Sequence, residues 1–293
     1  MRPLPHWRGG EALRRPEEAS EVLRRIREQE EAIRRRMARV RHKVAVMSGK
    51  GGVGKSFVSV NLAAALALMD RSVGLLDADL HGPSVPRLLG LRGAKVRGTP
   101  SGILPVAGPA GLKVMSIGFM LPSEGAPVIW RGPLKANVIR EVLAATEWGD
   151  LDYLIVDLPP GTGDEPLSVV QLIRDLAGVI LVTIPSELSR SVVERALSFA
   201  RQLGVRVLGV VENMSYFKCP RCGAVYRIFG EGAGRRVAEE AGVRFLGEVP
   251  LDPLASRCSD EGVLLVERYP DAEVSRAILR VAKAVLEEVE GGG

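Results

Sequence analysis

Residues 43–56 read KVAVMSGKGGVGKS, in which an apolar run leads directly into a glycine-rich loop. The β-branched run Lys43–Ser48 predicts a buried parallel strand, and the alanine- and leucine-rich segment Val58–Met69 predicts a helix. Between them, residues 49–56 have the spacing G-x-x-x-x-G-K-S of a phosphate-binding loop. A strand, this loop and a helix in this order predict an α/β fold that binds a nucleotide.

The loop residues have the properties that nucleotide phosphates require. Backbone N–H groups curl around the phosphates, and Gly51, Gly52 and Gly54 avoid blocking that approach or adopt angles that other residues avoid. Lys55 is expected to reach the β and γ phosphates, and Ser56 is expected to ligate Mg²⁺. The predicted nucleotide-binding residues are Gly49, Lys50, Gly51, Gly52, Val53, Gly54, Lys55 and Ser56.

Apolar strands alternate with amphipathic helices through residues 42–293. This alternation predicts one domain of the P-loop NTPase type, with a mostly parallel twisted sheet of about seven or eight strands and helices on both faces. Residues 92–111, rich in glycine and proline, predict a hairpin or a loop insertion. The predicted strands are 43–48, 72–77, 112–118, 151–157, 178–184, 206–211 and 244–248. The predicted helices are 55–69, 133–147, 164–176, 189–203, 231–241 and 271–289.

Residues 1–41 predict a charged helical extension before this domain. They hold 12 Arg, no Lys and 7 Glu, and Pro16 fits the first turn of a helix that runs to about Val40. Apolar residues recur along it, so the helix either packs on the body through one stripe or contacts a partner or an anionic surface. The extension carries the whole formal net charge of +5, which leaves residues 42–293 with no net charge. The body is therefore not a basic nucleic-acid platform.

The cysteine count and the hydropathy limit the cellular compartments in which we expect this protein. Three cysteines, an odd and small number, favour a reducing cytosol over a disulfide framework. A membrane span needs about 18 to 20 apolar residues in a row, which the sequence lacks. The N-terminus carries arginines without the apolar segment of a secretory signal. We expect a cytoplasmic protein without a membrane partner.

Further motifs accompany the loop, and together they indicate a family. They are DADLHGPS at 77–84, WRGP at 130–133, DYLIVDLPPGTGD at 152–164, ENMSYFKCPRCG at 212–223 and VPLDP at 249–253. With the loop GKGGVGKS, they resemble the Mrp/ApbC family of iron–sulfur cluster carrier ATPases, in the deviant Walker A class of MinD, ParA and nitrogenase iron protein. The resemblance covers roughly residues 42–290. It implies a homodimer that binds ATP and carries a labile [4Fe–4S] cluster from a cluster donor to apo iron–sulfur proteins.

The resemblance implies roles for three charged residues. Lys50 matches the second lysine of the deviant loop, which crosses a dimer interface to the partner's nucleotide; a solvated lysine at a loop tip is the alternative. Asp79 follows a strand that ends at Asp77, and resembles the carboxylate that positions or deprotonates the attacking water. Asp157 ends another apolar strand and resembles the Walker B aspartate, which would hold Mg²⁺ through water. Lys50, Lys55 and Asp79 are thus the expected catalytic residues.

The resemblance also implies a site for the base. The amide of Asn213 would recognise the adenine edge, although the residue alone would be interpreted as part of a turn. The segment that would close over the base is Pro250, Leu251 and Asp252. Phe57 departs from the family pattern, because a threonine that meets the α phosphate is usual there. Ser186 and Val192 also depart from the family's frequent Gln and Asp.

Residues 219–223 read CPRCG, a metal knuckle. Two thiolates at the spacing of Cys219 and Cys222 indicate one metal centre, but a tetrathiolate site needs four cysteines. The sequence adds only Cys258, interpreted as a buried small apolar residue. Two chains together would complete the ligand set for a [4Fe–4S] cluster, while zinc bridging a dimer and a vestigial pair are the alternatives.

The expected function is a slow ATPase that binds and transfers [4Fe–4S] clusters, because its nucleotide would switch dimer geometry rather than process a substrate. The alternatives are a positioning or partition ATPase of the MinD/ParA kind and a zinc-bridged regulatory dimer. A membrane-binding C-terminal helix or a basic DNA face would favour the positioning ATPase.

Overall fold

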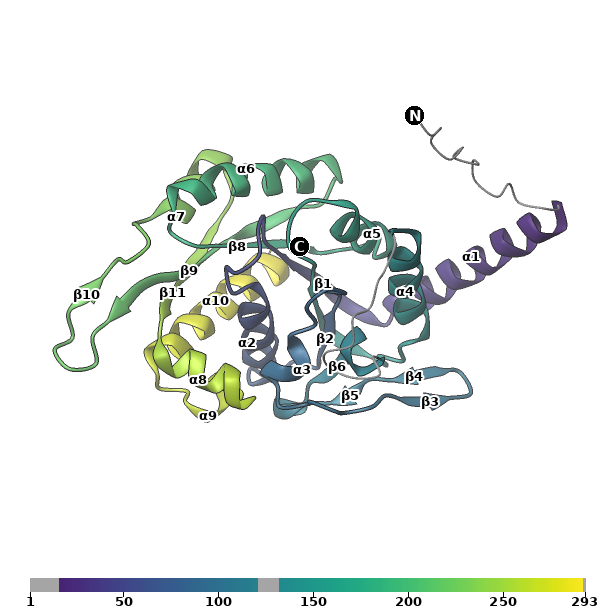
Figure 1. The fold of residues 1–293 in the computed structure, drawn as a ribbon, viewed down its shortest axis with the longest axis horizontal. Helices are drawn as coiled ribbons and strands as arrows, with labels where there is room; N and C mark the ends of the chain where they lie inside the picture. Colours follow the sequence, from purple (N-terminus) through teal and green to yellow (C-terminus); the bar gives the residue numbers. More distant parts are fainter. Residues whose placement is uncertain (1–15, 121–131, 292–293) are drawn as a thin grey trace, which may run out of the picture.

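The computed structural model describes residues 16–120 and 132–291, which build a nine-stranded sheet covered by helices (Figure 1). The strands of this sheet are β1 (Val40–Met47), β2 (Val73–Asp77), β5 (Val106–Ala107), β6 (Lys113–Ser116), β7 (Leu151–Asp157), β8 (Gly178–Thr183), β9 (Val207–Lys218), β10 (Val225–Tyr226) and β11 (Phe245–Leu251). A separate hairpin consists of β3 (Arg97–Thr99) and β4 (Gly102–Leu104).

The sheet is parallel through its centre. Its order is β10-β9-β8-β1-β7-β2-β6-β5, and β11 pairs with the side of β9. β1 lies between β7 and β8 and is parallel to both, whereas β5 and β10 pair antiparallel at the two ends. The central strands are buried along nearly their whole length, as continuous apolar runs in a doubly covered parallel sheet should be. The predicted fold class is confirmed, with two short edge strands beyond the expected set.

The helices form one layer on each face of the sheet. In β1, Val44 and Val46 point into one core, and Ala45 and Met47 point into the other. The helices that contribute to the first core are α2 (Lys55–Ala67), α3 (Val85–Leu88), α8 (Pro253–Glu261), α9 (Leu265–Arg268) and α10 (Glu273–Glu290). Those of the second are α1 (Pro16–Met37), α4 (Gly132–Ala145), α5 (Asp164–Leu172), α6 (Glu187–Gln202) and α7 (Ala233–Ala241). Two short 3₁₀ turns span Pro109–Gly111 and Ile117–Met120.

The predicted elements are all present, and many of their ends differ by a few residues. β9 runs to Lys218, past the expected end at residue 211, because its last residues pair with β10 and β11. α1 ends at Met37 rather than near Val40, since Val40 already belongs to β1. The short helices α8 and α9 were not predicted; α8 begins at an Asp252 cap followed by Pro253.

α1 extends away from the body and packs on it through the end nearer β1 (Figure 1). Ile33 and Met37 are buried, whereas Val22 and Leu23 are 51% and 56% exposed. The helix holds six Arg and six Glu, so the positive excess of the N-terminal segment lies outside it. One stripe therefore packs, as the first of the two interpretations expected. No helix within residues 16–120 and 132–291 is both long and apolar enough to cross a membrane.

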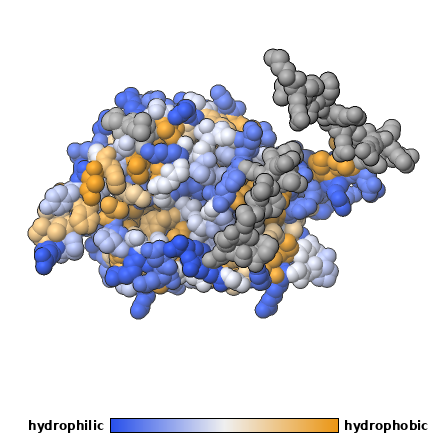
Figure 2. All heavy atoms as spheres, viewed as in Figure 1, coloured by the Kyte–Doolittle hydropathy of each residue, from blue (hydrophilic) through white to orange (hydrophobic). Residues whose placement is uncertain are grey.

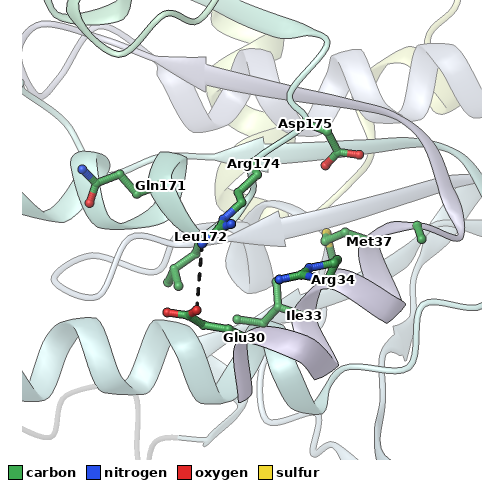
Figure 3. A pocket seen from close by; sticks show the side chains of 9 residues that line it. Glu30, Ile33, Arg34, Met37, Gln171, Leu172, Arg174 and Asp175 are labelled. Carbon is green, nitrogen blue, oxygen red and sulfur yellow. Dashed lines mark ion pairs between the residues drawn. The ribbon is translucent and has the colours of Figure 1, made fainter. Parts of the chain in front are cut away.

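A cavity of about 310 Å³ lies between α1 and the C-terminal end of α5 (Figure 3). Ile33, Met37 and Leu172 contribute apolar walls. Glu30 and Arg174 form an ion pair of 3.9 Å across it. α5 begins at the edge of the sheet where the phosphate-binding loop lies, so this cavity is at the far end of the helix, away from that loop.

Two glycines that end helices provide a test of how closely the end of α8 packs against Gly90. Gly262 ends α8 at φ 69°, and a Cβ there would lie 2.6 Å from Cα of Gly90. Gly242 ends α7 at φ 66° and has open space around it. Gly242→Ala should cost only the left-handed strain of about 1 kcal/mol, and Gly262→Ala should cost about 1–3 kcal/mol more. Urea unfolding measures both; equal losses would contradict the close approach of the two backbones.

Candidate functional site

The polar residues expected to bind nucleotide gather at one edge of the sheet. β1 runs into the loop 49–54, β2 ends at Asp77, and β7 ends at Asp157. These strands are parallel, so their carboxyl ends meet at the same edge, where open α/β sheets bind ligands. α2 begins here, with its N-terminus directed at the loop.

The loop leaves room for phosphate groups. Gly52 and Gly54 both have φ 80°, a conformation that favours glycine. A Cβ on Gly51 or Gly52 would meet nothing within 4 Å, so the concave side of the loop is open. The first turn of α2 has no side-chain cap, which leaves its N–H groups available to an anion. The geometry fits a nucleotide phosphate cradled by backbone.

Lys55 and Asp157 form a buried ion pair at the base of the loop. Lys55 Nζ lies 2.7 Å from Asp157 Oδ1, and the two side chains are 6% and 0% exposed. The Ser56 hydroxyl donates to Asp157 Oδ2 at 2.6 Å, and the Ser59 hydroxyl donates to Oδ1 at 2.6 Å. The structure thus brings together the lysine expected on phosphate and the two residues expected on Mg²⁺. Ser59 completes the network and was not predicted.

Lys50 lies at the tip of the same loop. Its side chain is partly exposed, and its carbonyl oxygen accepts a hydrogen bond of 2.9 Å from the Ser48 hydroxyl. The carbonyl group of Lys50 is therefore held by the residue that directly follows β1.

Asp77 is a member of the site that the sequence interpretation used only to mark the end of a strand. Its carboxylate accepts hydrogen bonds from Ser116 Oγ at 2.9 Å, Asp79 N at 3.2 Å and Val85 N at 3.3 Å. Complete burial, and secondly the nearby Asp157, raise the pKa of Asp77 to about 8. The first aspartate of DAD therefore shapes the loop that follows β2.

Asp79 is held by the turn that it begins. Its Oδ1 accepts the backbone N–H groups of His81 and Gly82 at 3.0 and 3.1 Å, and the residue is 9% exposed. His81 Nε2 in turn lies 3.0 Å from Glu165 Oε1 in the first turn of α5. The loop after β2 and the segment after β7 are therefore in direct contact, a link that the sequence interpretation did not foresee.

Asn213 lies in β9 and contacts the phosphate-binding loop. Its Nδ2 donates to the Val53 carbonyl oxygen at 2.9 Å, and the residue is 3% exposed. The interpretation of Asn213 as a turn residue is therefore wrong, since it pairs with Val249 of β11 in the sheet. Pro250–Asp252 follows directly along β11, and Asp252 Oδ1 caps α8 by accepting Leu254 N at 2.8 Å. The structure places the two segments expected around the base side by side.

Glu212 was missed as well. It is fully buried, and its Oε2 accepts the Gly234 N–H at 2.6 Å, while Oε1 accepts the Ser215 hydroxyl at 3.0 Å. These bonds fix α7 against β9 beside Asn213. A buried glutamate in an otherwise apolar strand is the only sequence signal that could have indicated this role.

Of the three departures from the family pattern, Phe57 and Val192 lie beside the loop. Val192 on α6 packs so closely that a Cβ on Gly49 would collide with its side chain. Phe57 is half-buried against the core on the α2 side of the sheet. Ser186 stands before α6 without a side-chain cap. Trp130 and Arg131 of the WRGP motif lie outside the described residues.

The cysteine knuckle is a tight turn between β9 and β10. Gly223 N donates to Cys219 O at 2.9 Å, and Cys219 N donates to Ala224 O at 2.8 Å. The backbone N–H groups of Cys222 and Arg221 donate to the Cys219 sulfur and hold the pKa of that thiol below its usual range. Such donors prearrange a thiolate for a metal centre.

The knuckle offers two candidate thiol ligands. Cys219 is partly exposed, Cys222 is exposed, and Cys258 is buried in α8, as expected of a small apolar residue. Within residues 16–120 and 132–291, no cluster of three or more His, Cys, Asp or Glu side chains is placed to hold a metal. A tetrahedral thiolate centre at the knuckle therefore needs ligands from outside this part of the chain.

Comparison with known proteins identifies the family. The family model described as the NUBPL iron-transfer P-loop NTPase, of the ParA group, matches residues 39–286. The chain belongs to this family. An iron-sulfur cluster carrier protein from Saccharolobus solfataricus is 48% identical over 94% of each chain. The bovine cytosolic Fe-S cluster assembly factor NUBP2 is 44% identical over 87% of this chain and 96% of its own.

Solved structures agree with this family assignment. The nucleotide-binding protein from Archaeoglobus fulgidus, in complex with ADP, is 44% identical and has a TM-score of 0.72, covering 80% of this chain and 92% of its own. MinD from Pyrococcus horikoshii, complexed with Mg-ADP, is 21% identical with a TM-score of 0.60, over 83% of this chain and 95% of its own. The second likeness shows a shared fold. The predicted family and P-loop NTPase fold are thus confirmed.

The lowered pKa of Cys219 can be tested by alkylation. Burial raises the pKa of Cys258, whereas backbone N–H groups lower that of Cys219. Because the thiolate is the nucleophile, limiting iodoacetamide at pH 7 should modify Cys219 well before Cys258. Peptide mass spectrometry of the reduced, anaerobic protein measures the order. The difference should vanish in urea, and equal rates in the folded protein would contradict the knuckle geometry.

Proposed function

We propose that this chain is a slow ATPase that binds a [4Fe–4S] cluster as cargo and transfers it to apo iron–sulfur proteins. The observation that carries the proposal is a half-complete thiolate site, Cys219 and Cys222, directly after the strand that also contacts the phosphate-binding loop through Asn213. Two copies of the knuckle supply the four thiolates that such a cluster takes. The names of relatives at 44–48% identity support an iron–sulfur cluster as the cargo.

The nucleotide is held at the edge formed by the loop. Backbone N–H groups of residues 50–56 bind the phosphates, and Lys55 leaves Asp157 to neutralise the β and γ phosphates. Ser56 and Asp157 would hold Mg²⁺, the aspartate through water, and the ion would offset phosphate charge. Asn213 and the segment Pro250–Asp252 bind the adenine. The loss of a threonine at position 57 removes one α-phosphate contact.

Hydrolysis uses groups on both chains of a homodimer. Asp79 positions a water in line with the γ phosphorus or takes its proton, the β–γ bridging bond breaks, and ADP and phosphate leave. Lys50 of one copy reaches the phosphates of the other and stabilises the charge that develops. The contact between His81 and Glu165 lets the loop after β2 and α5 respond to the nucleotide together.

The chain acts in the cytoplasm, with a cluster donor upstream and apo iron–sulfur proteins downstream. Reduced cysteines suit that compartment, and the bovine relative is named as cytosolic. Neither nucleic acid nor a membrane is a partner.

A positioning ATPase is the second candidate, and one observation weighs against it. Such a protein would need a free amphipathic helix for a membrane, but the apolar face of α10 is buried in the core. Metal analysis distinguishes the second alternative, a zinc-bridged regulatory dimer, from the carrier.

Three variants test the nucleotide site. Lys55→Ala should abolish ATP binding, because it removes the phosphate-binding cation. Lys50→Ala and Asp79→Asn should keep ATP binding and lose hydrolysis, the former by about 10²–10³ in rate. Titration calorimetry and phosphate release measure the two properties, with the exposed Lys283→Ala as the matched control. A Lys50→Ala protein as active as wild type would exclude a role in the partner's site.

Metal content tests the cargo. After anaerobic reconstitution with iron and sulfide, we expect about four irons per dimer, that is, two per chain. Cys219→Ala and Cys222→Ala should lose the cluster and keep ATP binding, and Cys258→Ala should keep both, because Cys258 lies in the core. Iron, sulfide and zinc are quantified per chain. One tightly held zinc that iron cannot displace, or a cluster that survives in Cys222→Ala, would favour the zinc-bridged dimer.

A further inference from the structure

Ser59 is a polar residue inside the core, and none of the proposed steps uses it. It lies in the second turn of α2, is 0% exposed, and donates its hydroxyl hydrogen to Asp157 Oδ1 at 2.6 Å. The hydroxyl also lies 3.0 Å from the Lys55 carbonyl oxygen. A hydroxyl has one hydrogen to donate, and the nearer, charged carboxylate is the stronger acceptor. The bond to Asp157 is therefore the principal interaction of this side chain.

Three donors among the described residues hold the Asp157 carboxylate. Lys55 Nζ lies 2.7 Å from Oδ1, and the Ser56 hydroxyl donates to Oδ2 at 2.6 Å. Ser59 is the third donor. The proposed function assigns two of the three to the ligand, because Lys55 would bind phosphate and Ser56 would bind Mg²⁺. When these two turn to the nucleotide, Ser59 is the donor that remains on the carboxylate.

The position of Ser59 in α2 explains why it can remain. Lys55 and Ser56 belong to the first turn of the helix, which has no side-chain cap and begins at the loop. Ser59 lies three residues beyond Ser56, on the same side of the helix and about 4.5 Å further along its axis. Its hydroxyl is thus within reach of Asp157 but one turn of helix away from the phosphate-binding loop.

Asp157 needs such a donor because it lies beside a second buried acid. Asp77 is paired with Asp157 across β2 and β7, and both residues are 0% exposed. Once Lys55 turns to the phosphates, burial and the neighbouring acid both act against a well-ordered carboxylate. A donor that stays on Oδ1 fixes the orientation of the carboxylate and leaves Oδ2 for a ligand.

We infer that Ser59 is a positioning residue for Mg²⁺ binding, which holds the Asp157 carboxylate in place after Lys55 and Ser56 have turned to the nucleotide. The inference rests on the proposed function, in which Ser56 and Asp157 hold the ion. Hydroxyl and carboxylate oxygens are ligands that suit Mg²⁺. A partner that orients a metal ligand typically contributes about 10–100-fold to metal affinity. Ser59 acts through Asp157 and touches neither the nucleotide nor the metal.

Removal of the hydroxyl tests the inference. In Ser59→Ala, we expect the Mg²⁺ concentration that half-saturates nucleotide binding to rise about 10–100-fold, while nucleotide binding in EDTA stays as in wild type. Ser59→Thr and Ser59→Val form a matched pair, since their side chains share one shape and differ in the hydroxyl. Threonine should preserve the Mg²⁺ affinity, and valine should lower it as alanine does.

Ser275→Ala is the control for loss of a buried hydroxyl as such. Ser275 on α10 is 0% exposed, and its hydroxyl has no hydrogen-bond partner within residues 16–120 and 132–291. Its removal deletes the same group from the core without touching Asp157. We expect this variant to bind nucleotide and Mg²⁺ as wild type does.

The measurement is titration calorimetry of the full chain with adenylyl imidodiphosphate, in EDTA and over a series of Mg²⁺ concentrations. Thermal unfolding is a second readout without turnover, because a ligand that binds the folded state raises Tm. The gain in Tm from the analogue with Mg²⁺ should shrink in Ser59→Ala and Ser59→Val, and persist in Ser59→Thr and Ser275→Ala. Phosphate release from ATP should need more Mg²⁺ in Ser59→Ala and recover towards the wild-type rate when Mg²⁺ saturates.

Failure of the inference differs from failure of the proposed function. If Ser59→Ala unfolds at a lower temperature without ligand but keeps the wild-type Mg²⁺ affinity, the bond is only structural and the inference is wrong. Equal Mg²⁺ affinities of Ser59→Thr and Ser59→Val would also overturn it, as would a wild type whose nucleotide affinity does not respond to Mg²⁺. If Mg²⁺ affinity depends on Ser59 but the wild type releases no phosphate or holds no cluster, the inference stands and the carrier proposal fails.

Discussion

The rest of the site depends on the buried ion pair between Lys55 and Asp157. It joins the start of α2 to the end of β7, and the hydroxyls of Ser56 and Ser59 also donate to the carboxylate. Removing one partner of such a pair costs about 3–5 kcal/mol, because the other charge is left buried. In the proposed function, a bound triphosphate would offer Lys55 a stronger anion, and Mg²⁺ would offer Asp157 a cation. The pair would then keep both groups in position until a nucleotide binds.

β9 connects this pair to the cysteines. Asn213 on β9 bonds to the loop at Val53, and Cys219 lies six residues further along the same chain segment. Bonds from β9 to Glu273 and from Glu212 to α7 stiffen that segment on both sides. A change at the loop can thus reach the knuckle through one continuous strand. This arrangement gives a physical route for the proposed coupling between nucleotide state and cluster binding.

In the proposed dimer, the position of the knuckle would account for the use of two copies. A complete site within one chain would bury its metal behind four ligands, whereas a shared site could open when the subunits move. Each copy alone would then expose the apolar residues that follow the knuckle, and Figure 2 shows apolar side chains at that end of the molecule. Tight packing elsewhere, with both faces of the sheet covered by helices, leaves this hairpin as a projection to which a partner has access.

Local spacing by itself determined the loop, the strand–helix alternation and the family of this protein. Phosphate binding requires glycines and a lysine at fixed intervals, and a covered parallel sheet requires apolar runs, so both are visible without coordinates. Tertiary structure alone decided the rest: the full burial of Asp77 and Glu212, the contact of His81 with Glu165, and the place of Asn213 in a strand rather than a turn. The short helices α8 and α9, and the exposure of residues 225–229, were also beyond local pattern. Burial and contact arise from segments far apart in the chain, and no residue's own neighbours in sequence reveal them.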